Sequence, residues 1–575
     1  MVKDNISQHT RQEIQQIINS NSPFVALDIA KMASSLGPEL TRSSLLPYLI
    51  ELEPCLEEEQ LIQITFALQA LVSYVGGPSY IKELMPLLNT MMLVDSKEIQ
   101  EESLLVLASL CKMMSSEDVD SSIYPFFVDL ASSEWFNYVQ VAASMIPLIF
   151  SYISQEKKKS LISLARQIAT HEYPFVRRRL AEVLTELDKA PDAALLTEEM
   201  LPCLLLLFDD NDVGVRATAV TALPVFFDLL ADKSVVLSLL LKSSADISWR
   251  VRHCWIKVTA IIIRRVDSET QAQLAKAYAK LLDDPEDEVK AFAASSLTEV
   301  ADSFSVDLIV QTIIPLLTQC LRSNREFVRK SLAPSVAGLS PCLGKENTLI
   351  HLKPIIVSLL EDPCVDVRLS VVTSLKSFSK TIGIENLSIF LPTIAALARD
   401  ESNWRIRKAV IEYVTELAEQ LGAEVFDEKF STLYLAWLAD QVYEVRFTAV
   451  KNMVILASNF GVEWAVSYLI PKIISLSENT TYIHRLTTIL ALKEIASVCS
   501  QAIIEAHILP VIIIFSEDKV VNVRISAVQV LGYFTRMISP QATNSIIRPA
   551  LLQRVSGDES DKDVIYYASE ALKMI

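Results

Sequence analysis

Glycine is scarce in this 575-residue chain: there are 11 glycines, about 2%, against an average usage near 7%. Phosphate-binding loops, dinucleotide-binding crossovers and turn-rich β-barrels all depend on glycine for positive φ angles. The chain has few glycines for such structures. We therefore predict an almost entirely helical protein, and most nucleotide-dependent enzyme classes are disfavoured.

Several other signals are missing. No apolar run approaches the roughly 18 residues of a membrane span, and the polar N-terminus has no signal-peptide core. We expect a cytoplasmic protein with no membrane partner, and the nucleus stays open as a second location. The formal charge of −18 argues against nucleic-acid binding, which needs a basic face.

Catalytic and metal-binding motifs are also absent. The sequence has no C-x-x-C, no H-E-x-x-H, no phosphate-binding G-x-x-x-x-G-K-[ST] and no G-x-S-x-G nucleophile motif. Its carboxylates, such as the run from Asp283 to Glu288, cluster where turns are expected, and solvated turns explain them. We predict no metal, no cofactor and no catalytic residue, and therefore a protein that binds other proteins.

What the chain does contain is an internal repeat, with a period of about 39 residues. Prolines within apolar segments recur at this spacing or its multiples, at Pro47, Pro86, Pro125, Pro202, Pro315, Pro354, Pro392, Pro471, Pro510 and Pro549. A second register of basic residues is stricter, with six consecutive intervals of 39, and comprises Arg177, Arg216, Arg252, Lys290, Arg329, Arg368, Arg407, Arg446, Arg485 and Arg524. Weaker copies fall near Ala26, Ile62, Gln100, Gln140 and Ile565. The count is about 15 repeats.

One repeat shows what each unit should be. The segment 351–360 has a helical apolar pattern with Pro354 in its early turns, and 362–366 is a turn in which Asp366 could cap the next helix. From 367 to 375, apolar residues fall on one helical face. Neither helix can bury that face alone, so neighbouring pairs must stack. We predict an all-α fold, an α-solenoid of about 15 HEAT-type repeats forming one stack over 1–575.

The repeated arginine has a structural interpretation that we favour. An arginine in one repeat can reach the capping aspartate of the next, and a ladder of such pairs would set the twist between repeats. Arginines 216, 329, 368, 446 and 524 follow this rule. The alternative is a row of basic contacts to a ligand.

Aromatic residues in the turns are the anomaly, since most turns hold Asp, Glu, Asn, Ser and Pro. Six turns carry Trp135, Tyr173, Trp249, Trp404, Tyr443 and Tyr482 at equivalent places in their repeats. Tryptophan, tyrosine and arginine often dominate interface energies, so we predict a shared partner-facing edge. The alternative is local packing of each ring over a neighbouring turn. Trp255, Trp437 and Trp464 fall within apolar stripes and are predicted to be core residues.

Several longer motifs resemble a known family. The segments 71–80, 338–348, 403–413, 426–429, 436–440 and 483–488 are similar to the scaffold (A, or structural) subunit of protein phosphatase 2A, a HEAT-repeat protein. The resemblance implies a non-catalytic scaffold that joins a catalytic subunit to exchangeable regulatory B-type subunits, forming a serine/threonine phosphatase holoenzyme. Any metal would belong to the catalytic partner.

The resemblance also implies where each partner binds. The approximate half 380–575 would hold the catalytic subunit, through Trp404, Arg405, Tyr443, Tyr482, His484, Val521 and Asn522. The approximate half 1–330 would hold regulatory subunits, through Trp135, Tyr173, Pro174, Arg177, Arg178, Trp249 and Arg250. The segment 252–268 is more apolar than the family pattern. An importin-like transport receptor, or another HEAT-repeat adaptor, is the alternative function.

Overall fold

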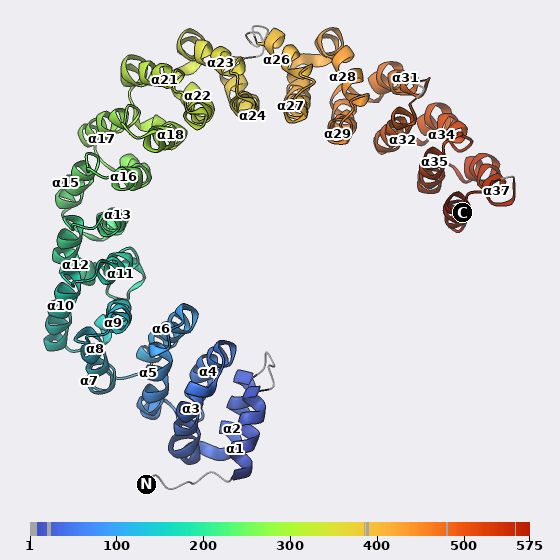
Figure 1. Ribbon diagram of the computed structural model, residues 1–575. Helices are drawn as coiled ribbons and strands as arrows, with labels where there is room; N and C mark the ends of the chain where they lie inside the picture. The colour runs from blue at the N-terminus through green and yellow to red at the C-terminus, as the bar shows by residue number, and fades with distance from the viewer. Residues whose placement is uncertain (1–7, 20–24, 384–385, 387–389, 479–480, 558) are drawn as a thin grey trace. The chain divides into compact units, whose positions relative to one another are not determined.

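The computed structural model describes residues 8–19, 25–383, 386, 390–478, 481–557 and 559–575. Within these ranges every regular element is a helix and none is a strand (Figure 1). The chain divides into two compact units, Met1–Tyr278 and Ala279–Ile575. Each unit is a stack of antiparallel helical pairs, so the predicted all-α solenoid is confirmed.

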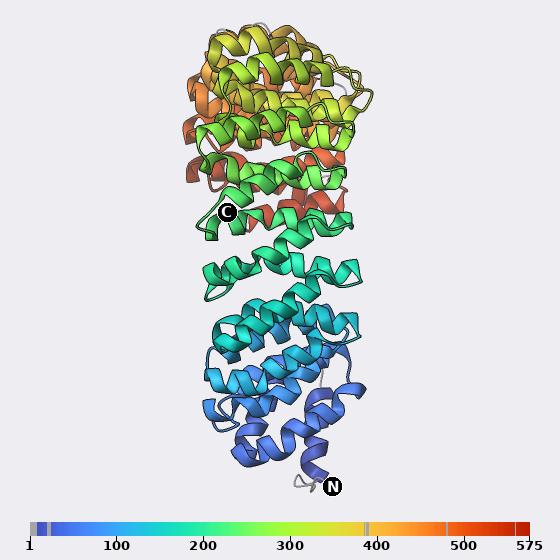
Figure 2. The same cartoon turned by 90° about the vertical axis from the view of Figure 1, so that its left-hand side faces the viewer.

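In the first unit, one layer contains the first helix of each pair and a second layer contains the second helix (Figure 1). The first helices are α1 (Gln8–Asn19), α3 (Leu46–Leu52), α5 (Met85–Leu93), α8 (Tyr124–Ala131), α10 (Gln155–Ala169), α12 (Ala193–Phe208) and α15 (Ser234–Ser243). The second helices are α2 (Val25–Leu40), α4 (Glu58–Leu71), α6 (Lys97–Cys111), α9 (Phe136–Ile149), α11 (Pro174–Leu184), α13 (Val213–Thr221) and α16 (Trp249–Ile262). Each second helix packs against the next, and Figure 2 shows helices of this unit lying one above another.

The second unit has the same two layers. Its first helices include α21 (Ile314–Cys320), α23 (Lys353–Leu360), α26 (Leu391–Ala398), α28 (Ser431–Leu438), α31 (Ile470–Ser475), α34 (Leu509–Phe515) and α37 (Arg548–Ser556). Its second helices are α18 (Asp287–Ser295), α22 (Glu326–Asn347), α24 (Val365–Ile382), α27 (Trp404–Lys429), α29 (Tyr443–Phe460), α32 (Tyr482–Ala496), α35 (Val521–Phe534) and α38 (Lys562–Leu572). From α18 to α38, each second helix again contacts the next.

The core lies between the two layers, as the apolar periodicity predicted. In α24, Val367, Val371, Val372 and Leu375 are all buried, and the helix continues to Ile382 because its apolar face continues.

The predicted capping role of Asp366 was wrong. Helix α24 begins at Val365, so Asp366 lies inside its first turn, and the turn carboxylate is instead Asp362, which accepts the backbone N–H of Cys364 at 2.8 Å.

Of the three tryptophans predicted to be core residues, two are buried and one is not. Trp255 and Trp437 are fully buried, which confirms the prediction. Trp464 is only half-buried, so its prediction was wrong. Its indole N–H donates to the Asp427 carboxylate at 3.1 Å, which holds the polar edge of the ring at the surface, while the rest of the ring packs on Phe460.

The recurring proline has the same structural surroundings in six of the repeats. A short π-helical turn comes just before Pro47, Pro315, Pro354, Pro471, Pro510 and Pro549. Proline has no N–H to donate, and its ring clashes with the carbonyl four residues earlier, so the hydrogen-bond pattern must widen at this point. The proline register therefore marks a bend in the first helix of those repeats.

Glycine has its own register, which the sequence analysis missed. Gly344, Gly383, Gly422 and Gly461 follow one another at 39-residue intervals, and each has a positive φ, between 72° and 93°. Each lies at the junction between a second helix and the next repeat, where the chain reverses direction. Only glycine adopts such a φ without strain, so the scarce glycines are concentrated where the repeat needs them.

The predicted arginine ladder is present. Arg329 donates from Nε and Nη2 to the Asp362 carboxylate of the next repeat, at 2.7 and 3.0 Å, and from Nη1 to its own turn at the Ser323 carbonyl. The same arrangement joins further pairs: Arg177 with Asp210, Arg216 with Asp246, Arg407 with Asp440, Arg485 with Asp518, and Arg524 with Glu559. Arg368 contacts Asp400 through Nη2 alone, at 3.3 Å. The acceptor is the turn carboxylate in each case.

Arg446 departs from the ladder, contrary to its prediction. Among the described residues, no carboxylate lies within ion-pair distance of its guanidinium. Arg177, Arg329, Arg407 and Arg485 all pair with an aspartate at one fixed place in the following turn. The equivalent position in the repeat after Arg446 is Asn479 in the sequence, and an amide cannot supply the missing negative charge.

The ladder predicts a specific acid sensitivity. Burial opposes ionisation of Asp362, but hydrogen bonds from Arg329 and from the Cys364 N–H outweigh it, so its pKa lies below the usual range. A lowered folded pKa gives stability that is complete above the unfolded value of about 4 and is lost as pH falls through the folded value. We expect the urea midpoint to change little between about pH 7 and 5 and to fall below about pH 4.

The control for this measurement is Asp362→Asn, whose midpoint should be lower at neutral pH and less dependent on pH below about 4. If the variant and the unaltered chain lose stability in parallel as pH falls, Asp362 does not contribute to the acid transition.

Candidate protein-binding ridge and groove

The six turn aromatics occupy equivalent places, as predicted. Each is the residue just before a second helix or its first residue: Trp135 and Tyr173 precede α9 and α11, whereas Trp249, Trp404, Tyr443 and Tyr482 begin α16, α27, α29 and α32. Because second helices pack side by side within each unit, their N-terminal residues form a row along one edge. We call this row the ridge, and describe it separately in each unit.

In the first unit, the ridge carries an exposed aromatic cluster. Trp135 is 70% exposed, and next to it the Phe136 ring meets Phe175 edge-on, with centroids 4.8 Å apart. Tyr173 stacks on Phe175 at 5.4 Å, and Pro174 between them is exposed. Phe136 and Phe175 were missed by the site prediction. The available signal was their large apolar side chains in the solvent-facing first turns of α9 and α11.

Two arginines in this region differ sharply. Arg177 belongs to the ladder, where its half-buried guanidinium donates to Asp210 from Nε and Nη2 and to two carbonyls of its own turn from Nη1. Arg178 is exposed, and its Nε lies 3.4 Å from Glu182 on the same helix. Arg178 is therefore open to a partner, whereas Arg177 supports the turn that presents Tyr173.

The two units share one motif on their ridges. Arg250 lies over the Trp249 ring, and Arg405 over the Trp404 ring, each with 4.8 Å between the guanidinium carbon and the ring centroid. In both motifs the indole is half-buried and the arginine exposed. Ile247, in the turn before Trp249, is 92% exposed and was also missed. A cation–π pair of this kind presents a flat, preformed contact surface at low entropic cost.

Further along the ridge of the second unit, Tyr443, Tyr482 and Asn522 are exposed, and Val521 is half-buried. His484 is half-buried with its Nδ1 atom inaccessible and without a hydrogen-bond partner among the described residues. The predicted residues thus lie at the N-terminal ends of four second helices, α27, α29, α32 and α35.

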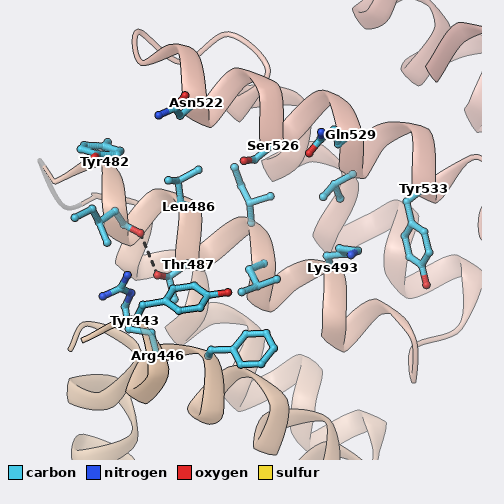
Figure 3. Close-up of a pocket in the computed structure, with 15 residues that line it drawn as sticks. Tyr443, Arg446, Tyr482, Leu486, Thr487, Lys493, Asn522, Ser526, Gln529 and Tyr533 are labelled. Atoms are coloured by element: carbon cyan, nitrogen blue, oxygen red, sulfur yellow. Dashed lines mark hydrogen bonds between the residues drawn. The ribbon is translucent and has the colours of Figure 1, made fainter. Parts of the chain in front are cut away.

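The ridge of the second unit leads into a groove along α29, α32 and α35 (Figure 3). The cavity has a volume of about 650 Å³ and is lined by Tyr443, Arg446, Phe447, Tyr482, Ile483, Leu486, Thr487, Ile489, Leu490, Lys493, Asn522, Ser526, Gln529, Val530, Tyr533. Tyr482 and Asn522 lie at one end of the view, and Lys493 and Tyr533 at the other. The sequence analysis missed most of this lining.

A sequence signal for the groove did exist. Asn522, Ser526, Gln529 and Tyr533 are spaced by three or four residues, which places them on one face of α35. That face is more polar than the core-facing one, so the search for apolar stripes passed over it.

Among the described residues, no group of three His, Cys, Asp or Glu side chains is arranged to hold a metal ion. Nor does any helix in those ranges have the length and hydropathy to cross a membrane. The ridge and the groove combine aromatic, aliphatic and cationic side chains with uncharged polar ones such as Asn522, Ser526 and Gln529, a mixture that suits a protein-binding surface.

Comparison with solved structures supports the fold. The chain matches Kap121p bound to Ste12p with a TM-score of 0.60 and 11% identity, covering 99% of this chain and 64% of Kap121p. It matches Kap95p, from a structure concerned with RanGDP, with a TM-score of 0.58 and 12% identity, covering 100% and 79%. At these identities the likeness shows a shared α-solenoid fold and nothing about function.

Comparison with characterised sequences finds similarity to a different group of proteins. No family model matches the chain. The beta isoform of the human phosphatase 2A 65 kDa regulatory subunit is 31% identical over 349 residues, which cover 59% of this chain and 57% of that protein. The corresponding PP2A regulatory subunit of Saccharomyces cerevisiae is 30% identical over 235 residues, covering 39% and 37%. The Dictyostelium discoideum phosphatase 2A scaffold subunit is 30% identical over 197 residues, covering 34% and 33%.

The matched segments thus span between about a third and just over half the length of these relatives. All three are named as regulatory or scaffold subunits of one phosphatase. The resemblance that the sequence motifs indicated is therefore confirmed, and the chain is similar to the scaffold (A) subunit of protein phosphatase 2A.

Proposed function

We propose that this protein is a non-catalytic scaffold that assembles a type 2A serine/threonine phosphatase. The ridge of the second unit holds the catalytic subunit, and the ridge of the first unit holds exchangeable regulatory subunits. The observation that carries the proposal is the row of aromatic and arginine side chains at the starts of successive second helices. The similarity to proteins named as regulatory or scaffold subunits of phosphatase 2A supports the choice of partner.

The physical mechanism is positional. Catalysis stays with the partner, and the scaffold fixes the distance and angle between two bound proteins. Exposed aromatic rings contribute most to such contacts because they bury a large area with few rotatable bonds. The ladder beneath them matters as well, because it holds each turn in place before a partner arrives.

The test uses the motif that both units share. Purified chain is mixed with a type 2A catalytic subunit, and complex formation is followed by size-exclusion chromatography and by titration calorimetry. The double variant Trp404→Ala with Arg405→Glu should weaken this complex by about a hundredfold or more, because it removes an anchor residue and reverses a charge. Thermal melting checks that the variant remains folded.

The matched control is Trp249→Ala with Arg250→Glu, which makes the same chemical change in the first unit. It should leave the catalytic complex intact and weaken binding of a B-type regulatory subunit. If the unaltered chain forms no stoichiometric complex with the catalytic subunit, the scaffold proposal fails. If both double variants weaken that complex equally, the assignment of partners to units is wrong.

A transport receptor of the importin class, which the sequence left open, is the alternative function; Kap121p and Kap95p share only the fold with this chain. A receptor of this class should bind a Ran-type GTPase in its GTP form. We expect no binding by this chain in the same calorimetric assay, and measurable binding would favour the alternative.

A further inference from the structure

We propose that the groove along α29, α32 and α35 binds an acidic segment of a partner protein. The inference goes beyond the phosphatase assignment, because it follows from the charge and shape of the groove and requires no catalytic subunit. Three features carry it: the charge of the lining, an arginine with no ion-pair partner among the described residues, and the apolar side chains that line the groove together with two cations.

The charge of the lining is opposite to that of the molecule. Arg446 and Lys493 both line the groove, and its lining contains no aspartate or glutamate. The whole chain carries a formal charge of −18, so a cationic groove without acids is a local exception. An anionic ligand gains from both cations there and meets no lining carboxylate.

The hydrogen bonds of Arg446 indicate more specifically than the lining charge where an acidic group would bind. Its Nη1 donates to the carbonyls of Asp440 and Gln441 at 2.7 and 2.9 Å, as the ladder arginines donate to their own turns. Nε and Nη2, the atoms by which Arg329 binds Asp362, make no hydrogen bond to any described residue. Burial lowers the pKa of Arg446, whereas the hydrogen bond to Asp362 raises the pKa of Arg329.

A carboxylate from a ligand would complete this incomplete pair. No described residue occupies Nε and Nη2 of Arg446, the two atoms that its counterparts use for a bidentate contact within the chain, and such contacts are among the strongest available to arginine. The position where the chain itself would supply the acid holds Asn479 in the sequence. We therefore place one carboxylate of the ligand at Arg446.

The rest of the groove matches an extended peptide. Phe447, Leu486 and Leu490 contribute apolar side chains to the lining, and Lys493 lies over the Tyr533 ring, 5.4 Å from its centroid, at the end away from Tyr482 (Figure 3). A volume of about 650 Å³ is in the range of specific ligand sites. We infer that the ligand has carboxylates at two separated positions, with apolar side chains between them.

A protein segment fits this lining better than a nucleic acid does. Nucleic-acid binding depends on neutralising many phosphates in succession, and the groove lining offers two cations. The strongly negative charge of the whole chain would also repel a long polyanion. A short acidic peptide needs only two charge contacts and gains the remainder from apolar burial.

The experiment measures fluorescence anisotropy of the full-length chain with a set of labelled peptides, in which glutamates at varied spacing are separated by leucine or phenylalanine. Matched peptides carry glutamine in place of glutamate. We expect at least one acidic peptide to bind about tenfold more tightly than its glutamine counterpart, and that difference to shrink at high salt. Hydrogen exchange should show protection of α32 and α35 on binding.

The decisive variant is Arg446→Gln with Lys493→Gln, which should weaken peptide binding about tenfold. The matched control is Lys330→Gln with Lys380→Gln, which removes the same charge from exposed positions on α22 and α24. That control should leave the affinity unchanged.

The inference is overturned if no acidic peptide binds more tightly than its glutamine counterpart, or if the groove and control variants behave alike. Tighter binding of single-stranded RNA than of any peptide would also overturn it. These outcomes are separate from the phosphatase test. If the catalytic subunit binds and the peptides do not, the groove inference alone fails, and the reverse result removes the scaffold proposal alone.

Discussion

Replacing Arg407 with alanine should destabilise the second unit by about 3–5 kcal/mol. Arg407 and Asp440 are both nearly buried, with 8% and 9% of their side chains exposed, and they are joined by contacts of 2.7 and 2.9 Å. Truncation leaves the Asp440 carboxylate buried without its cation, and it also removes the donor to the Asp400 carbonyl. The measurement is urea unfolding of the full-length chain, with hydrogen exchange to locate the effect.

The neighbouring residue is the control. Lys408 lies 3.4 Å from Glu444 in an exposed pair, so Lys408→Ala should cost less than about 1 kcal/mol. Combining Arg407→Ala with Asp440→Ala should recover part of the loss, because the stranded charge is removed. If Arg407→Ala and Lys408→Ala lower the free energy of unfolding equally, the ladder contributes no more to stability than an exposed surface pair does.

Trp437→Ala should lower the free energy of unfolding by about 3–5 kcal/mol, as much as Arg407→Ala, because it opens a large cavity. Trp437 is fully buried in α28, meets Tyr434 edge-on at 5.6 Å, and donates its indole N–H to the Ala398 carbonyl of the preceding first helix at 3.1 Å. Losing the ring therefore weakens the contact between repeats. Amide exchange in α26 and α28 should accelerate by about a hundredfold or more under native conditions.

Trp437→Phe separates packing from hydrogen bonding. It keeps most of the ring volume and loses the N–H, so we expect the free energy of unfolding to fall by about 1–2 kcal/mol. If the phenylalanine and alanine variants are equally unstable, the hydrogen bond to Ala398, and not the cavity, dominates. Because repeat arrays can unfold in parts, each change should shift the transition that includes the second unit.

The repeat architecture could be predicted because its causes are local. An amphipathic period defines each helix, and the strict 39-residue spacing of Arg329, Arg368 and Arg407 defines the register. In such folds each repeat contacts its neighbours, so regularity in sequence becomes regularity in space. Gly383 and its counterparts recur at the same 39-residue spacing, and the sequence analysis did not use this spacing to place the junctions between repeats.

The candidate site was only partly predictable. Trp404 and Tyr443 could be found because a large aromatic residue in a polar turn is unusual along the sequence. Phe447, Lys493 and Tyr533 could not be found in that way, since each is an ordinary helical residue and they meet only when three helices lie side by side. The half-buried state of Trp464 was likewise decided by a partner distant in sequence, the Asp427 carboxylate.

The sequence by itself determined the helical pairs, their spacing, the buried faces and the turns that carry aromatic residues, because hydrophobic periodicity and turn chemistry act over a few residues. Tertiary structure decided which carboxylate the ladder arginines reach, and it left Arg446 with none among the described residues. Arg329 and Arg446 occupy the same place in their repeats. Their difference arises because the ion pair depends on a charge in the following repeat, which is brought into contact only when the repeats stack.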